Sequence, residues 1–98
     1  MDPELPDITI SDVVISTAGR EQGKLFYVVG TDPIYLLLAN GKDRTLDKPK
    51  RKKRKHVQKV LRSETRVAEK LRLGDKVLNS ELRRDLAFLS REMQSSDL

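Results

Sequence analysis

The fold is decided by residues 13–30, which read Val-Val-Ile-Ser-Thr-Ala-Gly-Arg-Glu-Gln-Gly-Lys-Leu-Phe-Tyr-Val-Val-Gly. β-Branched and aromatic side chains favour strands, so this stretch predicts a strand at residues 12–16, a loop, and a second strand at residues 24–31. Gly19 and Gly23 bracket the loop, where a tight connection requires positive φ, which glycine adopts at little cost. We therefore expect both glycines to be structural.

Further short strands are expected on both sides of this pair. Residues 8–10 could form a first edge strand, and the apolar run at residues 34–39 predicts a strand buried on both faces. Asn40-Gly41 is a strong hairpin signal, so we expect a type I′ turn followed by a short polar edge strand at residues 43–47. A last strand is expected at residues 55–58, with Val57 facing inward. The core candidates are Val14, Ile15, Leu25, Tyr27 or Val28, Ile34, Leu36, Leu38 and Leu46.

The C-terminal third has helical periodicity. Ser63 is the expected N-cap of a first helix, which should stop at Gly74. A second helix begins at Asn79 or Ser80 and carries an apolar stripe, formed by Leu82, Leu86, Leu89 and Met93. Arg83, Arg84, Asp85 and Arg91 are expected on its other face. The stripe should pack against the rest of this chain, and the alternative is a docking face for another protein.

Composition predicts one small α+β domain with a strongly cationic segment. The chain has 98 residues, of which 37% are hydrophobic and 36% charged, with a net charge of +5. Residues 48–62 contain nine Lys or Arg and no acid, and subtracting these nine charges leaves −4 for the rest. Adjacent like charges repel, so we expect an extended, mobile arm that binds polyanions. The acidic residues 1–7 are expected to be a flexible leader.

Several function classes are disfavoured by the sequence. There is no cysteine, no long apolar segment and no basic signal peptide, which suggests a cytoplasmic protein without membrane association. The single histidine, His56, lies among cations that favour its neutral form, and we expect it to be solvated or to contact RNA. No metal-ligand cluster, nucleotide-binding loop or catalytic constellation is present. We expect no enzyme activity, no cofactor and no small-molecule substrate.

Taken alone, the basic segment allows several functional interpretations. It could be a solvated linker, a nuclear-localisation patch, or a nucleic-acid contact. If the Arg20 loop and residues 43–47 share one end of the sheet, their cations would merge with the segment into one polyanion-binding face. The candidate binding residues are Arg20, Lys24, Lys42, Arg44, Lys48, Lys50, Arg51, Lys52, Lys53, Arg54, Lys55 and His56.

The glycine pattern resembles a known motif. A β-branched pair, a small-Gly-Arg step at residues 18–20, a second glycine four residues on, and an apolar strand closing on Val-Gly are similar to a KOW motif. Asn40-Gly41, the Leu-Asp-Lys-Pro-Lys passage at residues 46–50 and the helical tail extend the resemblance. Together they resemble small bacterial KOW-domain RNA-binding proteins, related to large-subunit ribosomal proteins of the L-fourteen-e group. The chain departs from that pattern at Ser11-Asp12, where many KOW strands begin with glycine, and at the acidic Glu21.

The resemblance implies a fold and a function. It implies an SH3-like barrel of the translation-protein type at residues 8–58, which includes part of the basic arm 48–62, followed by a helical hairpin at residues 63–94. It also implies a ribosomal or ribosome-associated protein that binds structured RNA, with ribosomal RNA and ribosomal proteins as partners. Phosphate and 2′-hydroxyl contacts suit such RNA. The alternatives are a NusG-type protein-interaction module in transcription and, third, a DNA-binding protein.

Overall fold

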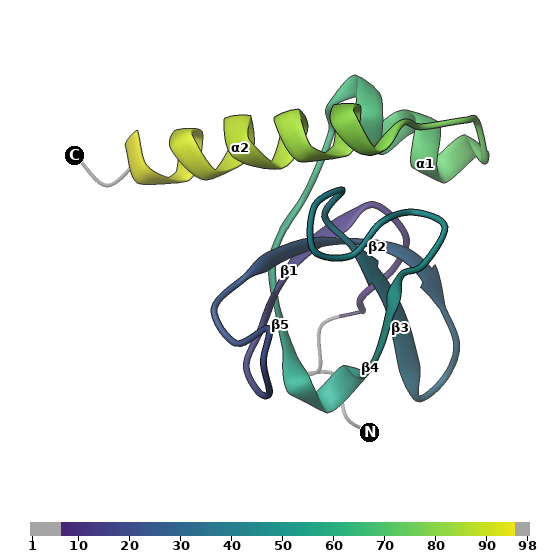
Figure 1. Cartoon of the computed structure of the whole chain (residues 1–98), viewed down its shortest axis with the longest axis vertical. Helices are drawn as coiled ribbons and strands as arrows, with labels where there is room; N and C mark the ends of the chain where they lie inside the picture. Colours follow the sequence, from purple (N-terminus) through teal and green to yellow (C-terminus); the bar gives the residue numbers. More distant parts are fainter. Residues whose placement is uncertain (1–6, 96–98) are drawn as a thin grey trace.

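The computed structural model describes residues 7–95, which form a five-stranded antiparallel sheet and two α-helices (Figure 1). The elements in chain order are β1 Asp12–Ser16, β2 Leu25–Thr31, β3 Tyr35–Ala39, β4 Lys50–Lys53, a 3₁₀ turn η1 Arg54–His56, β5 Val57–Arg62, α1 Arg66–Leu73 and α2 Asn79–Ser95. The α+β class is confirmed. Within this described range, no helix has the length and apolar character needed to cross a membrane. The expected leader lies largely outside the described residues.

The sheet is strongly curled. Its strand order is β4-β3-β2-β1-β5, so the two edge strands are neighbours in sequence and only η1 separates them (Figure 1). No ladder joins β4 to β5 among residues 7–95, and the sheet is therefore not closed. Register shifts at Val13/Val14 and Val28/Gly30 increase its twist. A Cβ at Gly30, at the second shift, would lie 2.9 Å from Leu37 Cδ1, so a larger residue there would have to displace the Leu37 side chain.

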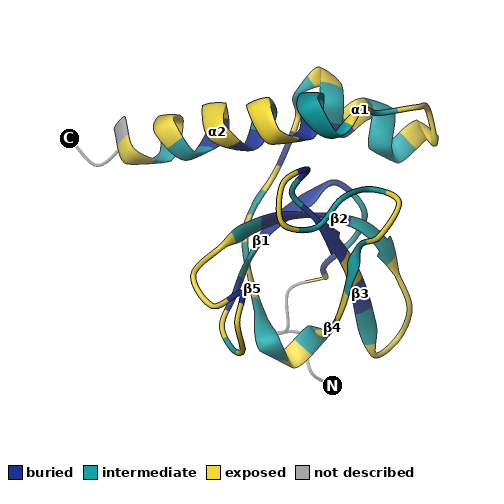
Figure 2. Ribbon diagram, viewed as in Figure 1, coloured by how far each residue is buried: buried dark blue, intermediate teal, exposed yellow. Residues whose placement is uncertain are grey.

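Both faces of the sheet are buried, each in its own core. The inner face of the curl buries one apolar cluster, formed by Ile8, Val14, Phe26, Val28, Leu36 and Leu38. The opposite face packs under the helices through a second cluster, formed by Val13, Tyr27, Ala39, Ala68, Leu82, Leu86 and Leu89 (Figure 2). The sequence left open whether Tyr27 or Val28 is buried. Both are, because successive side chains of a strand point to opposite faces.

The connection between β3 and β4 differs from the prediction. Residues 43–47 form no strand, and residues 40–49 are a loop instead of a two-residue hairpin. Asn40 Oδ1 accepts hydrogen bonds from the backbone N–H groups of Lys42 and Arg44, which holds the chain in a wider turn. Gly41 has a φ of 78° and packs so closely on the start of α2 that a Cβ would lie 2.2 Å from Asn79 O. Helix docking therefore decides this turn.

Other predictions at the strand ends were also wrong. Residues 8–10 form no strand, although Ile8 is buried. Ile34 precedes β3 and is 60% exposed, and Leu37 within β3 is exposed between the buried Leu36 and Leu38. The last strand is β5, which begins at Val57 and is longer than expected. Val57 does pack against the inner core, as predicted.

The helices pack on the sheet as their stripe predicts. Leu82, Leu86 and Leu89 are buried against it, so the stripe is satisfied within this chain. Helix α1 ends at Gly74, which has the predicted left-handed conformation with a φ of 76°. The N-cap is Thr65, not Ser63, because the Thr65 hydroxyl accepts from Ala68 N.

A buried polar cluster joins the helices to the sheet. The Tyr27 hydroxyl donates to the Asp85 carboxylate and lies 2.8 Å from Ser63 Oγ, while Thr65 Oγ1 donates to Asp85 Oδ2 at 2.8 Å. Asp85, which was expected on the helix face opposite the leucine stripe, is therefore half-buried and bonded into this cluster. Burial, reinforced by the hydrogen bond to Asp85, raises the pKa of Tyr27 to about 12. This cluster explains why Ser63 is buried and unavailable as a cap.

Candidate nucleic-acid interface

The basic segment is built into the sheet. Lys50–Lys53 is β4, η1 follows it, and Val57–Arg62 is β5, so the prediction of an extended arm was wrong for these residues. Backbone pairing with the apolar β3 overrides the mutual repulsion of the cations. A strand alternates its side chains between two faces, which divides the run into inward and outward groups.

The inward group includes Lys50 and Lys52. They pair with Leu38 and Leu36, whose side chains belong to the inner core, so these two lysines share that face of the sheet. Lys52 is only 8% exposed, and its Nζ donates to Ala18 O at 2.6 Å. Lys52 therefore serves the fold, and it offers little surface to the ligand that it was expected to contact.

The buried Glu21 carboxylate pairs with both Arg44 and Lys52. Glu21 is 6% exposed and accepts from Arg44 Nη2 at 2.6 Å and from Arg44 Nε at 3.2 Å. Lys52 Nζ lies 3.8 Å from its other oxygen. The hydrogen bond from Arg44 lowers the pKa of Glu21, and the charges of Arg44, Lys50 and Lys52 add to this effect. We refer to Glu21, Arg44 and Lys52 as the Glu21 cluster.

The loop glycines are shaped around that cluster. Gly19 and Gly23 have φ values of 76° and 87°, and the predicted positive φ is confirmed at both. A Cβ at Gly19 would lie 3.1 Å from Lys52 Nζ. Immediately before β1, Ser11 has a positive φ of 77°. Its Oγ accepts from Arg72 Nη1 at 2.8 Å, which ties that turn to α1.

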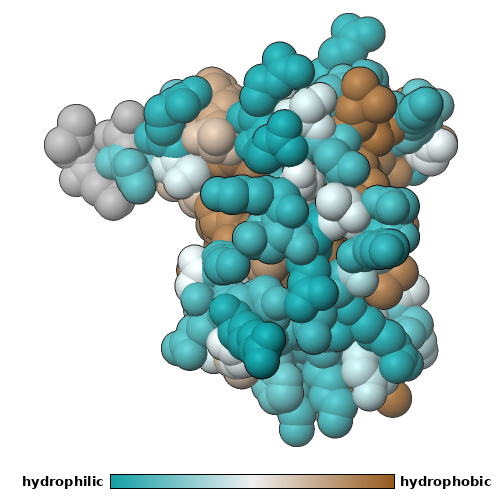
Figure 3. All heavy atoms as spheres, viewed as in Figure 1, coloured by the Kyte–Doolittle hydropathy of each residue, from teal (hydrophilic) through white to brown (hydrophobic). Residues whose placement is uncertain are grey.

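The outward group is Arg51, Lys53 and Lys55, which we call the outer cation row. All three side chains are exposed. The Arg51 guanidinium lies 3.7 Å from the centroid of the Tyr35 ring, a cation–π contact that the sequence did not predict. Among residues 7–95, no acidic side chain forms an ion pair with any member of the row. The surface below the helices is mostly hydrophilic in the view of Figure 3.

The two loops expected to contribute cations do share one end of the sheet. Lys24 Nζ pairs with Asp43 at 3.2 Å, and Arg44 pairs with Glu21, so residues 17–24 contact residues 40–49. The same contacts neutralise Lys24 and Arg44, which weakens the predicted common face. Three exposed loop cations make no ion pair among the described residues, namely Arg20, Lys42 and Lys48.

Arg54 and His56 secure η1. Arg54 Nε donates to Asp32 O at 3.0 Å, and its Nη1 donates to Ile8 O at 3.1 Å. His56 is half-buried, and its backbone oxygen accepts from Thr17 N at 2.9 Å. The Asp32 carboxylate nearby accepts from the backbone N–H groups of Tyr35 and Ile34, which lower its pKa.

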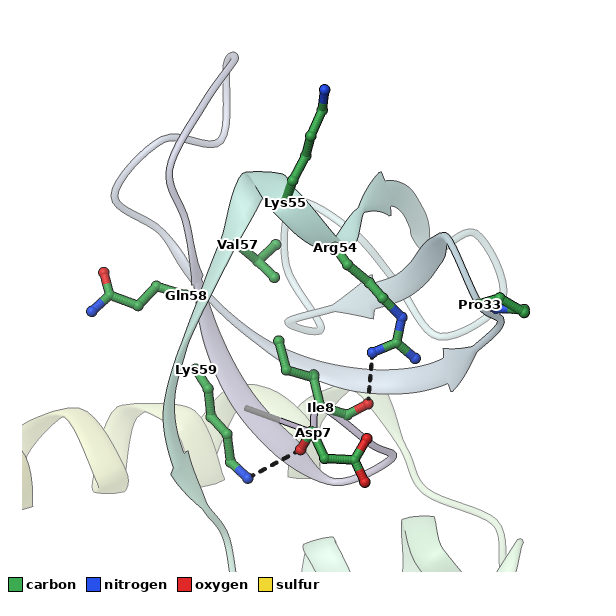
Figure 4. Close-up of a pocket in the computed structure, with 8 residues that line it drawn as sticks. All are labelled: Asp7, Ile8, Pro33, Arg54, Lys55, Val57, Gln58 and Lys59. Carbon is green, nitrogen blue, oxygen red and sulfur yellow. Dashed lines mark hydrogen bonds between the residues drawn. The ribbon is translucent and has the colours of Figure 1, made fainter. Parts of the chain in front are cut away.

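A hollow lies at the seam where η1 joins β5, and the sequence did not predict it. It has a volume of about 870 Å³, and its lining comprises Asp7, Ile8, Pro33, Arg54, Lys55, Val57, Gln58 and Lys59 (Figure 4). Lys59 was counted in the basic segment but not among the candidate binding residues. No local signal could have found the hollow, because it forms only when three distant segments meet.

Comparison with models of known protein families gives no match, and comparison with curated protein sequences gives none either. In the part of the chain that the structure describes, no three His, Asp or Glu side chains are grouped so as to hold a metal ion. The resemblance to KOW proteins therefore stays a prediction.

Proposed function

We propose that this chain is an RNA-binding protein of the translation machinery, ribosomal or ribosome-associated, with an SH3-like KOW barrel as its core. The curled sheet supports the barrel assignment, because its edge strands are joined by a single 3₁₀ turn. The resemblance of residues 13–30 and 46–50 to the KOW pattern supports the choice of RNA and of translation.

The outer cation row carries this proposal. Arg51, Lys53 and Lys55 are exposed on one strand and its following turn, in a stretch of fifteen residues, 48–62, that contains no acid. Each such cation that neutralises a phosphate releases a counterion, and the affinity then falls steeply with salt. Because β4 is ordered by its ladder with β3, these groups lose less conformational entropy on binding than a free arm would.

Sedimentation of the tagged protein from its own cells through a sucrose gradient tests the proposal. We expect co-migration with the large ribosomal subunit at low salt and loss of it when Arg51, Lys53 and Lys55 are all changed to Gln. The matched control changes three exposed cations of the C-terminal helical region to Gln, namely Arg66 on α1, Lys76 in the loop before α2 and Arg91 on α2, and should still co-migrate. Migration of the wild-type protein only at the top of a low-salt gradient would contradict a ribosomal role.

A protein-interaction module of NusG type is the second candidate. The helices leave large apolar side chains uncovered, with Leu73 67% exposed, Leu78 52% and Phe88 46%. Salt separates the two candidates. Binding through the three cations of the row should lose about 20- to 40-fold in affinity between about 50 and 200 mM salt, whereas binding through apolar side chains barely responds. Competition between ribosomal RNA and duplex DNA distinguishes the third possibility, a DNA-binding protein.

A further inference from the structure

The hollow at the seam, which we call the seam pocket, has apolar walls. Ile8 and Val57 point into it, and Pro33 closes one side (Figure 4). Ile8 belongs to the inner core and Val57 packs against that core, so these walls are held by the fold. An apolar cavity of this kind takes a flat or compact nonpolar group out of water.

Arg54 gives the pocket an oriented planar group. Its guanidinium donates to two carbonyl oxygens that belong to separate segments, Asp32 O at 3.0 Å and Ile8 O at 3.1 Å. These two bonds fix the plane of the group while it lines the pocket (Figure 4). A fixed guanidinium plane is a surface on which unpaired nucleobases stack.

Two lysines, Lys55 and Lys59, lie near the opening of the seam pocket. Lys59 is held by the buried Asp12 carboxylate, with Nζ 3.2 Å from Oδ2, and also lies 3.4 Å from Asp7 O. The Lys55 side chain points away from the pocket and remains exposed (Figure 4). Lys55 is the last member of the outer cation row, so the pocket continues directly from that row. Because Lys59 is already paired with Asp12, a nucleotide with its base in the pocket would have its phosphates on the side of Lys55 and the outer cation row.

We propose that the seam pocket binds one unpaired nucleobase of the RNA, stacked against Arg54, while the outer cation row holds the adjacent phosphates. This inference rests on the proposed function and narrows the ligand to RNA with a bulged or looped nucleotide. Bases of a continuous A-form duplex cannot reach such a pocket, since they are paired and stacked.

Binding of two matched RNA hairpins to the full chain tests the inference. The hairpins differ only by one bulged nucleotide in the stem, and fluorescence anisotropy measures both affinities at the same salt. We expect the bulged hairpin to bind about tenfold or more tightly, since stacking of one base gives about 1–3 kcal/mol. Val57→Phe, which fills the pocket without changing charge, should abolish the preference and leave the affinity for the paired hairpin unchanged.

Val60→Phe is the matched control. Val60 lies on the same strand, is 37% exposed and does not line the pocket, so this variant should keep the preference. Thermal unfolding checks that both variants fold. A bulged 2-aminopurine gives a second readout on the wild-type protein, because its fluorescence should fall on binding as the base stacks.

Each outcome bears on one proposal. Equal affinity of the wild-type protein for both hairpins, a preference that survives in Val57→Phe, or an unchanged 2-aminopurine signal would overturn the seam-pocket inference and leave RNA binding intact. A preference that arises only after deletion of residues 1–6 would show that the chain's own N-terminus fills the pocket, and this too would overturn it. Failure to bind either hairpin at low salt would contradict the proposed function itself.

Discussion

Lys52 and Lys53 are adjacent in the sequence and in β4, yet they have opposite environments. Lys52 is 8% exposed, bonds to Ala18 O and belongs to the Glu21 cluster, whereas Lys53 is exposed and has no ion-pair partner among residues 7–95. The strand pleat alone produces this difference. A count of basic residues therefore overestimates the cations that a ligand could reach, because some of them stabilise the fold.

The largest expected effect comes from removing the buried acid. Glu21→Ala leaves Lys52 buried without a carboxylate and Arg44 without its partner, so we expect the free energy of unfolding to fall by about 2–4 kcal/mol. Urea denaturation measures the change. Glu64→Ala is the matched control, because Glu64 also contacts two arginines but is 73% exposed, and it should cost under about 0.5 kcal/mol. Equal losses in the two variants would contradict a structural role for the Glu21 cluster.

Tyr27 is a second buried polar group, and the side chains that its hydroxyl contacts carry no positive charge. The pKa of Tyr27 rises from an ordinary value of 10.0 to about 12, so its contribution to stability is present below pH 10 and is lost as the pH rises towards 12. This loss amounts to about 2–3 kcal/mol. Thermal unfolding at pH 8, 10 and 11.5 should show a steeper alkaline decline in the wild-type protein than in Tyr27→Phe. Parallel declines would show that other groups cause it.

Substitution of each neighbouring lysine, Lys52 and Lys53, tests the difference between inward and outward cations directly. Lys52→Met removes one of the two donors to Ala18 O, the other being Ser16 Oγ, and one of the two cations paired with Glu21. We expect a loss of about 1–2 kcal/mol in stability with an unchanged salt dependence of RNA binding. Lys53→Met should change stability by less than about 0.5 kcal/mol but reduce the slope of log affinity against log salt by about 1. Denaturation and binding titrations on both variants check the pair. The same pattern in both variants would remove the distinction between inward and outward cations.

The smallest expected effect is the loss of folding stability at acid pH. The Arg44 hydrogen bond lowers the pKa of Glu21 below its ordinary value of 4.5. The contribution of Glu21 is therefore present above pH 4.5 and is lost as the pH falls through the lowered value. Urea midpoints at pH 7, 4.5 and 3 should fall less steeply in Glu21→Gln than in the wild-type protein. Part of the decline should remain, because the pKa values of Asp32 and Asp43 are also lowered.

The sequence by itself determined the elements that depend on near neighbours. The β-branched and aromatic residues predicted β1 and β2 to within one residue, because strand preference is expressed over a few positions. The leucine stripe of α2 and the stop at Gly74 were also correct, since helical periodicity and left-handed φ are local properties. The charge of the basic segment is evident in the sequence, but its conformation was predicted wrongly, because the segment forms strands and not an extended arm.

Tertiary structure decided which charged groups are available. Lys52 became buried and Asp85 half-buried because distant partners, Glu21 and Tyr27, lie opposite them in the folded chain. Residues 40–49 became a loop because α2 packs on Gly41. The seam pocket exists only where the turn before β3, the segment before β1 and η1 come together. Each of these features depends on contacts between residues far apart in the chain, which neither composition nor periodicity encodes.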